Sequence, residues 1–233
     1  MREAIRLARK AKKRGEVPIG AVVVLNGRIV GRGYNLRTKL QMATAHAEMR
    51  AIDRACKKLH SWRLPGAELY VTLEPCCHQG RQPPCTDAIL EAGIARVVVG
   101  SDDPNPLVAG KGIDILRRAG VEVETGVLKA ECDALNYVFF HYITTGLPYV
   151  VMKYAMTLDG KIATCSGKSK WITGEAAREQ VHRDRSRYRA IMAGGGTVLA
   201  DDPMLNCRVE GGRDPVRVIC DSHLRTPLTM ISG

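Results

Sequence analysis

The segment His46-Ala47-Glu48, followed by Pro75-Cys76 and then Cys85, constrains this chain more than any other feature. One imidazole nitrogen and two cysteine sulfurs suit zinc, and a catalytic zinc usually takes three protein ligands and leaves its fourth position to water. Glu48 lies two residues from His46, so its carboxylate can exchange protons with that water without binding the metal. We therefore predict a fold that gathers His46, Cys76 and Cys85 as zinc ligands around a catalytic Glu48.

The motif H-x-E with P-C-x-x-C is typical of zinc-dependent nucleobase deaminases, and this chain resembles it with one departure. Eight residues separate Cys76 from Cys85, and residue 79 is Gln, so Cys76 has no C-x-x-C partner. The ordinary alternative is that these cysteines are core residues, because free cysteines are often buried. We interpret Cys77 as a spectator, and His78 either approaches a substrate phosphate or is solvated.

Composition narrows the class of protein. Eight cysteines at irregular spacings, without a charged-then-apolar amino terminus, indicate a reducing cytoplasm in which thiols bind metal or pack in the core. No apolar run approaches the roughly 20 residues that span a bilayer, so we expect a cytoplasmic protein without a membrane partner. The net charge of +11 permits an anionic substrate, a nucleotide cofactor or nucleic acid. Two Phe and two Trp leave little material for stacking bases.

The hydrophobic pattern alternates between strand and helix, which predicts an α/β fold with a three-layer first domain. Asn26-Gly27 predicts a hairpin turn, and helical spacing from Ala45 places His46 and Glu48 in the first turn of a helix. The residues 144–148 suggest a boundary between domains 1–145 and 146–233. The glycine run 194–196 indicates either a plain loop or a backbone approach to a phosphate. The predicted strands are 19–25, 28–34, 68–73, 95–100, 121–124, 149–156, 189–193 and 216–220, and the predicted helices include 86–92, 112–119, 130–142 and 175–187.

Residues 72–85 closely resemble the bifunctional riboflavin-biosynthesis deaminase/reductase family, in which a longer spacing between zinc thiolates is the rule. Residues 103–112, 158–163, 169–173 and 197–203 extend the resemblance, which runs from about residue 67 to the end. It implies a cytidine-deaminase-like domain followed by a partial dihydrofolate-reductase-like α/β domain, and it implies a homo-oligomer. The first domain would hydrolyse an amine of a phosphoribosylated diaminopyrimidinone, and the second would reduce the ribose to a ribityl chain with NADPH.

The resemblance also implies roles for individual residues. In the deaminase, Arg81, Asp103 and Asn105 resemble substrate contacts, and Arg81 suits a phosphate. In the reductase, the residues that resemble NADP contacts are Ala155, Trp171, Thr197, Asp201 and Ser222, and those that resemble substrate contacts are Ser169, Arg185, Leu205 and Arg208. Each has an ordinary alternative: a core tryptophan, a helix-face charge or a turn residue.

Residues 1 to about 75 also resemble tRNA adenosine deaminases. Val17 stands where the riboflavin family usually has an Asn that touches substrate, and Asn35 stands where that family usually has His. A tRNA adenosine deaminase, which would bind nucleic acid, is therefore the alternative enzyme. A zinc-stabilised binding module without catalysis is a further alternative, and it requires a fourth protein ligand such as Cys77 or His78.

The reductase-like segment is about half the usual length of its family. The missing half would supply a glycine-rich cofactor loop and much of the sheet. We therefore expect weak or absent reductase activity and weak NADPH binding.

Overall fold

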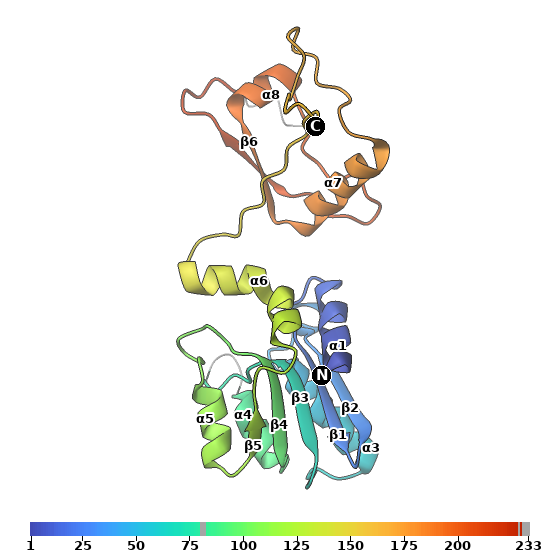
Figure 1. Cartoon of the computed structure of the whole chain (residues 1–233), viewed down its shortest axis with the longest axis vertical. Helices are drawn as coiled ribbons and strands as arrows, with labels where there is room; N and C mark the ends of the chain where they lie inside the picture. The colour runs from blue at the N-terminus through green and yellow to red at the C-terminus, as the bar shows by residue number, and fades with distance from the viewer. Residues whose placement is uncertain (80–82, 228, 230–233) are drawn as a thin grey trace. The chain divides into compact units, whose positions relative to one another are not determined.

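The computed structural model describes residues 1–79, 83–227 and 229. The chain divides into two compact units, Met1–Val150 and Val151–Gly233 (Figure 1). Over these described residues, each unit has its own sheet, with five strands in unit 1 and two in unit 2. Among the described residues, every helix is too short or too polar to cross a bilayer.

Unit 1 is built on a mixed sheet with the strand order β2-β1-β3-β4-β5. The predicted hairpin is confirmed, because β1 pairs antiparallel with β2 and both Asn26 and Gly27 have positive φ angles. β1 is also antiparallel to β3, whereas β3, β4 and β5 run parallel. The carboxyl ends of β3 and β4 therefore open onto the same edge of the sheet. The strands are β1 (Gly20–Leu25), β2 (Arg28–Tyr34), β3 (Glu68–Leu73), β4 (Arg96–Ser101) and β5 (Glu122–Glu124).

Helices cover both faces of this sheet, so the predicted three-layer arrangement is confirmed. On one face, Ala51 of α3, Ile89 of α4 and Leu116 of α5 belong to one buried cluster. On the other face, Leu7 of α1 packs against Val22, and α6 packs against α1. The helices are α1 (Arg2–Lys12), α2 (Arg37–Leu40), α3 (Ala47–Leu59), α4 (Cys85–Glu91), α5 (Lys111–Arg118) and α6 (Lys129–Thr145); the short α2 was not predicted.

Close packing of α3 on β2 sets the place of the H-x-E motif. A side chain at Gly33 would collide with the backbone of Ala47, so the glycine allows the first turn of α3 to lie directly on the strand. His46 is the N-cap residue of this helix and Glu48 lies in its first turn. The prediction was therefore right for Glu48 and one position off for His46.

A charge network joins the amino ends of the three parallel strands. The Arg96 guanidinium lies 3.1 Å from a carboxylate oxygen of Glu68, 3.1 Å from Glu122 and 2.5 Å from Glu124. This network lies at the amino edge of the parallel strands, opposite the edge at which β3 and β4 end.

Unit 2 has a smaller α/β arrangement in which β6 and β7 pair in parallel. The helix predicted at 175–187 and the strand predicted at 216–220 are confirmed. Of the two readings left open for the glycine run, the plain loop does not hold, because α8 begins directly after β6. Residues 149–156 form neither helix nor strand, so a strand there was also wrong. The elements are α7 (Glu175–Arg187), β6 (Ala190–Gly194), α8 (Gly195–Asp201) and β7 (Val216–Cys220).

Candidate metal centre and cofactor cavity

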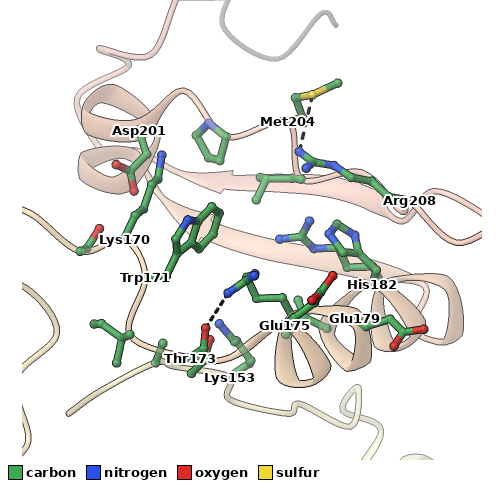
Figure 2. A pocket seen from close by; sticks show the side chains of 18 of the residues that line it. Lys153, Lys170, Trp171, Thr173, Glu175, Glu179, His182, Asp201, Met204 and Arg208 are labelled. Carbon is green, nitrogen blue, oxygen red and sulfur yellow. Dashed lines mark hydrogen bonds between the residues drawn. The ribbon is translucent and has the colours of Figure 1, made fainter.

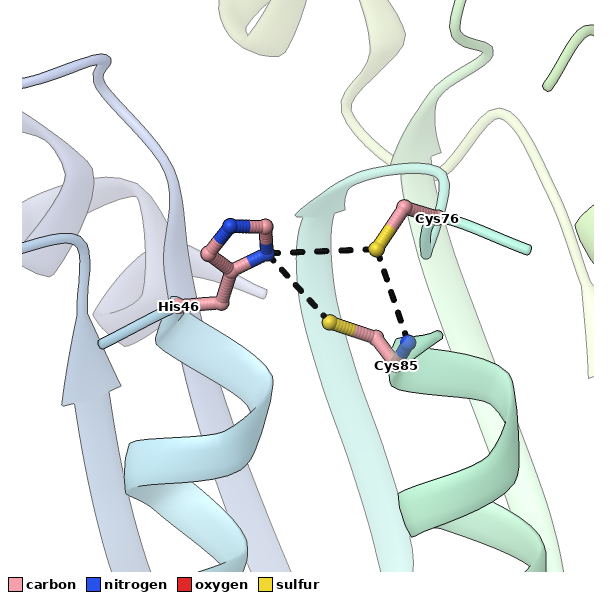
Figure 3. Close-up of side chains that lie close together, drawn as sticks. All are labelled: His46, Cys76 and Cys85. Atoms are coloured by element: carbon pink, nitrogen blue, oxygen red, sulfur yellow. Dashed lines mark hydrogen bonds between the residues drawn. The ribbon is translucent and has the colours of Figure 1, made fainter. Parts of the chain in front are cut away.

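His46, Cys76 and Cys85 come together at the carboxyl edge of the unit 1 sheet (Figure 3). Their ligand atoms all lie within 4.8 Å of one another. His46 Nδ1 is 3.4 Å from Cys85 Sγ and 3.9 Å from Cys76 Sγ. Tetrahedral zinc bonds of about 2.0 Å to nitrogen and about 2.3 Å to sulfur separate such atoms by roughly 3.5 Å. The three side chains therefore fit a zinc ion.

The pKa values of the two thiols of the cluster are shifted in opposite directions. Cys85 donates a hydrogen bond to Cys76, and this bond together with His46 lowers the pKa of Cys76 to about 4. The same hydrogen bond, and then burial, raise the pKa of Cys85 well above its ordinary value. A thiolate is the form that binds metal, so the lowered pKa of Cys76 favours its role as a ligand.

Glu48 is the carboxyl group beside this cluster. Its side chain is 3% exposed, and Oε2 has no hydrogen-bond partner among the described residues. Burial raises the pKa of Glu48 to about 7, against the opposing effect of His46. A carboxyl group with a pKa near neutrality is suited to accept a proton and return it.

Asn35 supports the H-x-E motif. The sequence had marked this residue only because the riboflavin family usually has His at its position. Its side-chain Oδ1 accepts a hydrogen bond of 2.9 Å from the backbone N–H of Ala47, between His46 and Glu48. Asn35 and Val17 both line a cavity of about 490 Å³. The two residues that depart from the riboflavin-family pattern, Val17 and Asn35, therefore line the same cavity. The remaining lining residues are Glu16, Arg37, Thr38, Gln41, Met42 and Ala43.

The predicted substrate contacts of unit 1 lie in the loop after β4, except Arg81, which lies outside the described residues. Asp103 Oδ1 accepts the N–H of Asn105 at 2.9 Å, and Asn105 Oδ1 accepts the N–H of Leu107 at 3.1 Å. Burial raises the pKa of Asp103, and the charges of nearby residues, Cys76 among them, contribute. Both side chains thus hydrogen bond within the loop after β4, and Asp103 lies near enough to Cys76 for the charge of Cys76 to help raise its pKa.

A second cavity, of about 690 Å³, lies in unit 2 (Figure 2). Thr197 on α8 and Ser222 after β7 do not line it. They lie at the carboxyl edge of β6 and β7, because both follow parallel strands. The other predicted reductase residues all line the cavity: Ala155, Ser169, Trp171, Arg185, Asp201, Leu205 and Arg208.

His182 and Arg185 of α7 lie near Arg208 in this cavity, whose lining also includes Glu175 and Glu179 of α7. Burial and the charges of Arg185 and Arg208 lower the pKa of His182, and burial and Arg208 lower the pKa of Arg185. Arg185 Nε and His182 Nδ1 are buried without a hydrogen-bond partner among the described residues. Arg185 and Arg208 are therefore the groups of this cluster that suit an anionic ligand.

Arg178 and His182 line this cavity from α7 but were not predicted from the sequence. Arg178 stacks over the Trp171 ring at 4.5 Å and donates a 2.7 Å hydrogen bond to the Thr173 carbonyl. Arg178, His182 and Arg185 are spaced by four and three residues, so they share a helix face. That spacing was the available signal.

Each of the two units matches a known protein family. Residues 1–101 match the cytidine and deoxycytidylate deaminase zinc-binding region, and residues 148–231 match the RibD C-terminal domain. The riboflavin biosynthesis protein RibD of Actinobacillus pleuropneumoniae is 56% identical over 98% of this chain and 59% of its own length. The chain thus spans about six tenths of that relative.

Solved structures similar to this chain include a deaminase/reductase and a tRNA deaminase. A diaminohydroxyphosphoribosylaminopyrimidine deaminase/5-amino-6-(5-phosphoribosylamino)uracil reductase from Thermotoga maritima is 49% identical, with a TM-score of 0.81, over 95% of this chain and 62% of its own. A tRNA:A34 deaminase is 40% identical, with a TM-score of 0.52, over 58% of this chain and 96% of its own. The predicted fold class, a zinc deaminase domain followed by a reductase-type α/β domain, is confirmed.

Proposed function

We propose, on the premise that this chain belongs to the family of riboflavin-biosynthesis proteins with a deaminase and a reductase domain, that unit 1 is a zinc-dependent deaminase. Its substrate is a phosphoribosylated diaminopyrimidinone. The observation that carries the proposal is a buried Glu48 beside three ligand atoms within 4.8 Å of one another.

His46, Cys76 and Cys85 would hold the zinc, which when bound activates water for attack on an amine-bearing ring carbon. Glu48 takes a proton from the water at Oε2, the oxygen that has no other partner among the described residues. It returns the proton to the amine, which leaves as ammonia. Glu48 as a whole is 3% exposed, so its carboxyl group has little contact with bulk water.

The loop after β4 would orient the substrate. Asn105 Oδ1 is occupied by the N–H of Leu107, so its amide nitrogen is the atom to donate to a ring or ribose oxygen. Asp103 would accept from a ring or ribose group, and Arg81 would bind the phosphate. The net charge of +11 favours the approach of such an anion.

The test is ammonia release by zinc-loaded protein, with product masses measured for the pyrimidine and for a tRNA anticodon stem-loop in parallel. We expect ammonia and the deaminated pyrimidine, and neither from zinc-free protein. No product from either substrate would contradict the proposal and favour a non-catalytic zinc module.

A tRNA adenosine deaminase is the second candidate. Its support is the 40% identity with the tRNA:A34 deaminase over 58% of this chain, together with the cavity at Val17 and Asn35. Inosine in the stem-loop, without pyrimidine turnover, is the result that would select it.

Unit 2 would bind NADPH, which supplies a hydride when bound. Ala155, Trp171 and Asp201 would contact the cofactor from the cavity, whereas Thr197 and Ser222 would contact it from the carboxyl edge of β6 and β7. Arg185 and Arg208 would hold the anionic substrate. Because Trp171 is 72% exposed, we expect weak binding in a calorimetric titration with NADPH. Tight stoichiometric binding would contradict this weakness.

We also infer a reducing compartment, the cytoplasm, and a homo-oligomer. All eight cysteines, each within the described ranges, are free, as a thiol-ligated metal site requires. Val138 and Tyr142 of α6 are 44% and 58% exposed, and exposed apolar side chains of this kind support self-association. Light scattering coupled to gel filtration tests the oligomer, and a mass of one chain would contradict it.

A further inference from the structure

Glu74 is a buried carboxylate at the end of β3 to which the mechanism above assigns no role. Its side chain is 3% exposed. Oε2 accepts backbone N–H groups of Asp103 at 3.3 Å and Gly110 at 3.0 Å, and Oε1 accepts the N–H of Ile113 at 3.4 Å. One side chain therefore satisfies three backbone donors that lie 29 to 39 residues further along the chain.

Two of these donors belong to the start of α5. Gly110 is the N-cap residue of this helix, and Ile113 lies in its first turn. The first N–H groups of a helix have no partner within the helix, and a negative charge there is stabilising. Glu74 thus caps α5 from a neighbouring strand.

The same contact brings α5 against the zinc-ligand segment. A Cβ atom at Gly112 would collide with the carbonyl oxygen of Pro75 and would lie 3.3 Å from Glu74 Oε1. Only a glycine at this position lets the helix end approach so closely. Glu74 and Pro75 directly precede Cys76, so the carboxylate lies between the metal segment and α5.

The loop that Glu74 holds is the one proposed to orient the substrate. Asp103 begins the held stretch and Gly110 ends it, so both ends of the loop that contains Asn105 attach to one carboxylate. Inside the loop, the hydrogen bonds from Asn105 to Asp103 and from Leu107 to Asn105 continue the same chain of contacts.

We propose that Glu74 is a positioning residue that holds the substrate loop, with Asp103 and Asn105, in register with the zinc-ligand segment at Cys76. It does not touch the reacting atoms and acts through the loop. The kinetic consequence rests on the proposed deaminase function, whereas the hydrogen-bonded clamp does not.

The test compares Glu74→Gln with Glu68→Gln. The Glu74→Gln substitution keeps the volume of the side chain, but the new amide nitrogen cannot accept an N–H group, so the clamp weakens. We expect stoichiometric zinc, a raised KM for the pyrimidine and a loss of kcat/KM on the order of tenfold to a hundredfold. Amide exchange in residues 102–113 should accelerate, while exchange in β3 and α3 should not. Glu68 lies at the other end of β3, pairs with Arg96 and has a 33% exposed side chain, so its substitution should change neither loop exchange nor KM.

Several outcomes overturn the inference. Unchanged exchange in residues 102–113, or an equal acceleration throughout unit 1, would mean that Glu74 has no specific hold on the loop. A lower kcat with unchanged KM would assign Glu74 to the chemical step. Glu74→Asp keeps the charge on a shorter side chain, and its exchange and KM should fall between those of the Glu74→Gln variant and the unmodified protein.

Two further arms keep the result decisive. If neither variant folds, residue-resolved exchange in the unmodified protein is the readout, and unprotected amides at Asp103, Gly110 and Ile113 would overturn the clamp. If no substrate is turned over, the deaminase proposal fails separately, because zinc content and loop exchange still report on Glu74.

Discussion

The two units reach an α/β arrangement with very different amounts of buried apolar surface. In unit 1, Leu69, Val71, Ile89, Val97 and Val99 have no exposed surface. In the described residues of unit 2, the buried apolar side chains are Val198, Leu205 and Pro215. Met192 of β6 and Val216 of β7 are 69% and 62% exposed.

Strand pairing in unit 2 is therefore supported by much less burial than strand pairing in unit 1. β6 and β7 are hydrogen bonded in register, yet parallel strands are normally covered on both faces. Burial of apolar surface supplies most of the favourable free energy of folding. We therefore expect the metal centre of unit 1 to lie on rigid elements, and the cavity of unit 2 to be the more mobile site.

The largest expected effect tests whether the two units function separately. Glu48→Gln removes the proton acceptor of unit 1, so ammonia release should fall on the order of a thousandfold, with zinc content and NADPH binding unchanged. Glu91→Gln, at an exposed position of α4, is the matched control and should be neutral. Turnover retained by the Glu48→Gln variant would remove Glu48 from its role.

The next effect measures the difference in packing directly. Leu69→Ala should lower the free energy of unfolding of unit 1 by about 2–5 kcal/mol, because it leaves a cavity in the core. Met192→Ala should change the free energy of unfolding of unit 2 by less than about 0.5 kcal/mol. Trp62 and Trp171 lie one in each unit, so urea unfolding followed by fluorescence in Trp171→Phe and Trp62→Phe backgrounds reports each unit. Equal losses would show that Met192 is packed as tightly as Leu69.

Removal of zinc should destabilise one unit only. A ligand present at a hundred times its dissociation constant stabilises the folded state by about 2.7 kcal/mol. Chelation should therefore shift the unfolding transition reported by Trp62 and leave that of Trp171 unchanged. Parallel shifts of both transitions would contradict the assignment of the metal to unit 1.

The smallest effect concerns surface charge. Hydrogen bonds and ion pairs from Arg6 and Arg32 lower the pKa of Glu3 to about 2, and Arg32 ties α1 to β2. Because the folded pKa lies below the ordinary value of 4.5, this stabilisation is present above about pH 4.5 and is lost as the pH falls towards 2.

Glu3→Gln should therefore lower the free energy of unfolding by less than about 1 kcal/mol at pH 7, and the difference should disappear in acid. The control is Glu179→Gln in unit 2, whose Arg183 partner lies on the same helix and is 53% exposed. No measurable change is expected there. A pH-independent effect of Glu3→Gln would show that packing, and not charge, is responsible.

Much of this molecule followed from local patterns in the sequence. Asn26-Gly27 predicted the hairpin because few residues accept two successive positive φ angles. The alternation of strand and helix predicted the layers, and the H-x-E motif with its cysteines predicted a cluster that the structure does bring together. The glycine run at 194–196 left two readings open, because glycine is compatible with both a loop and the first turn of a helix, and the structure excludes the plain loop.

The remaining features were decided only by tertiary structure. Glu74 became a clamp because the parallel order of β3 and β4 brings its carboxylate to amides 29 or more residues away, and nothing in the local sequence marks those partners. The cavity of unit 2 likewise gathers α7, the segment around Trp171 and the residues after α8. Residue type and spacing thus indicated which chemistry is proposed for this chain. The fold determined which distant groups orient it, because contacts between residues far apart in sequence exist only once the sheet has formed.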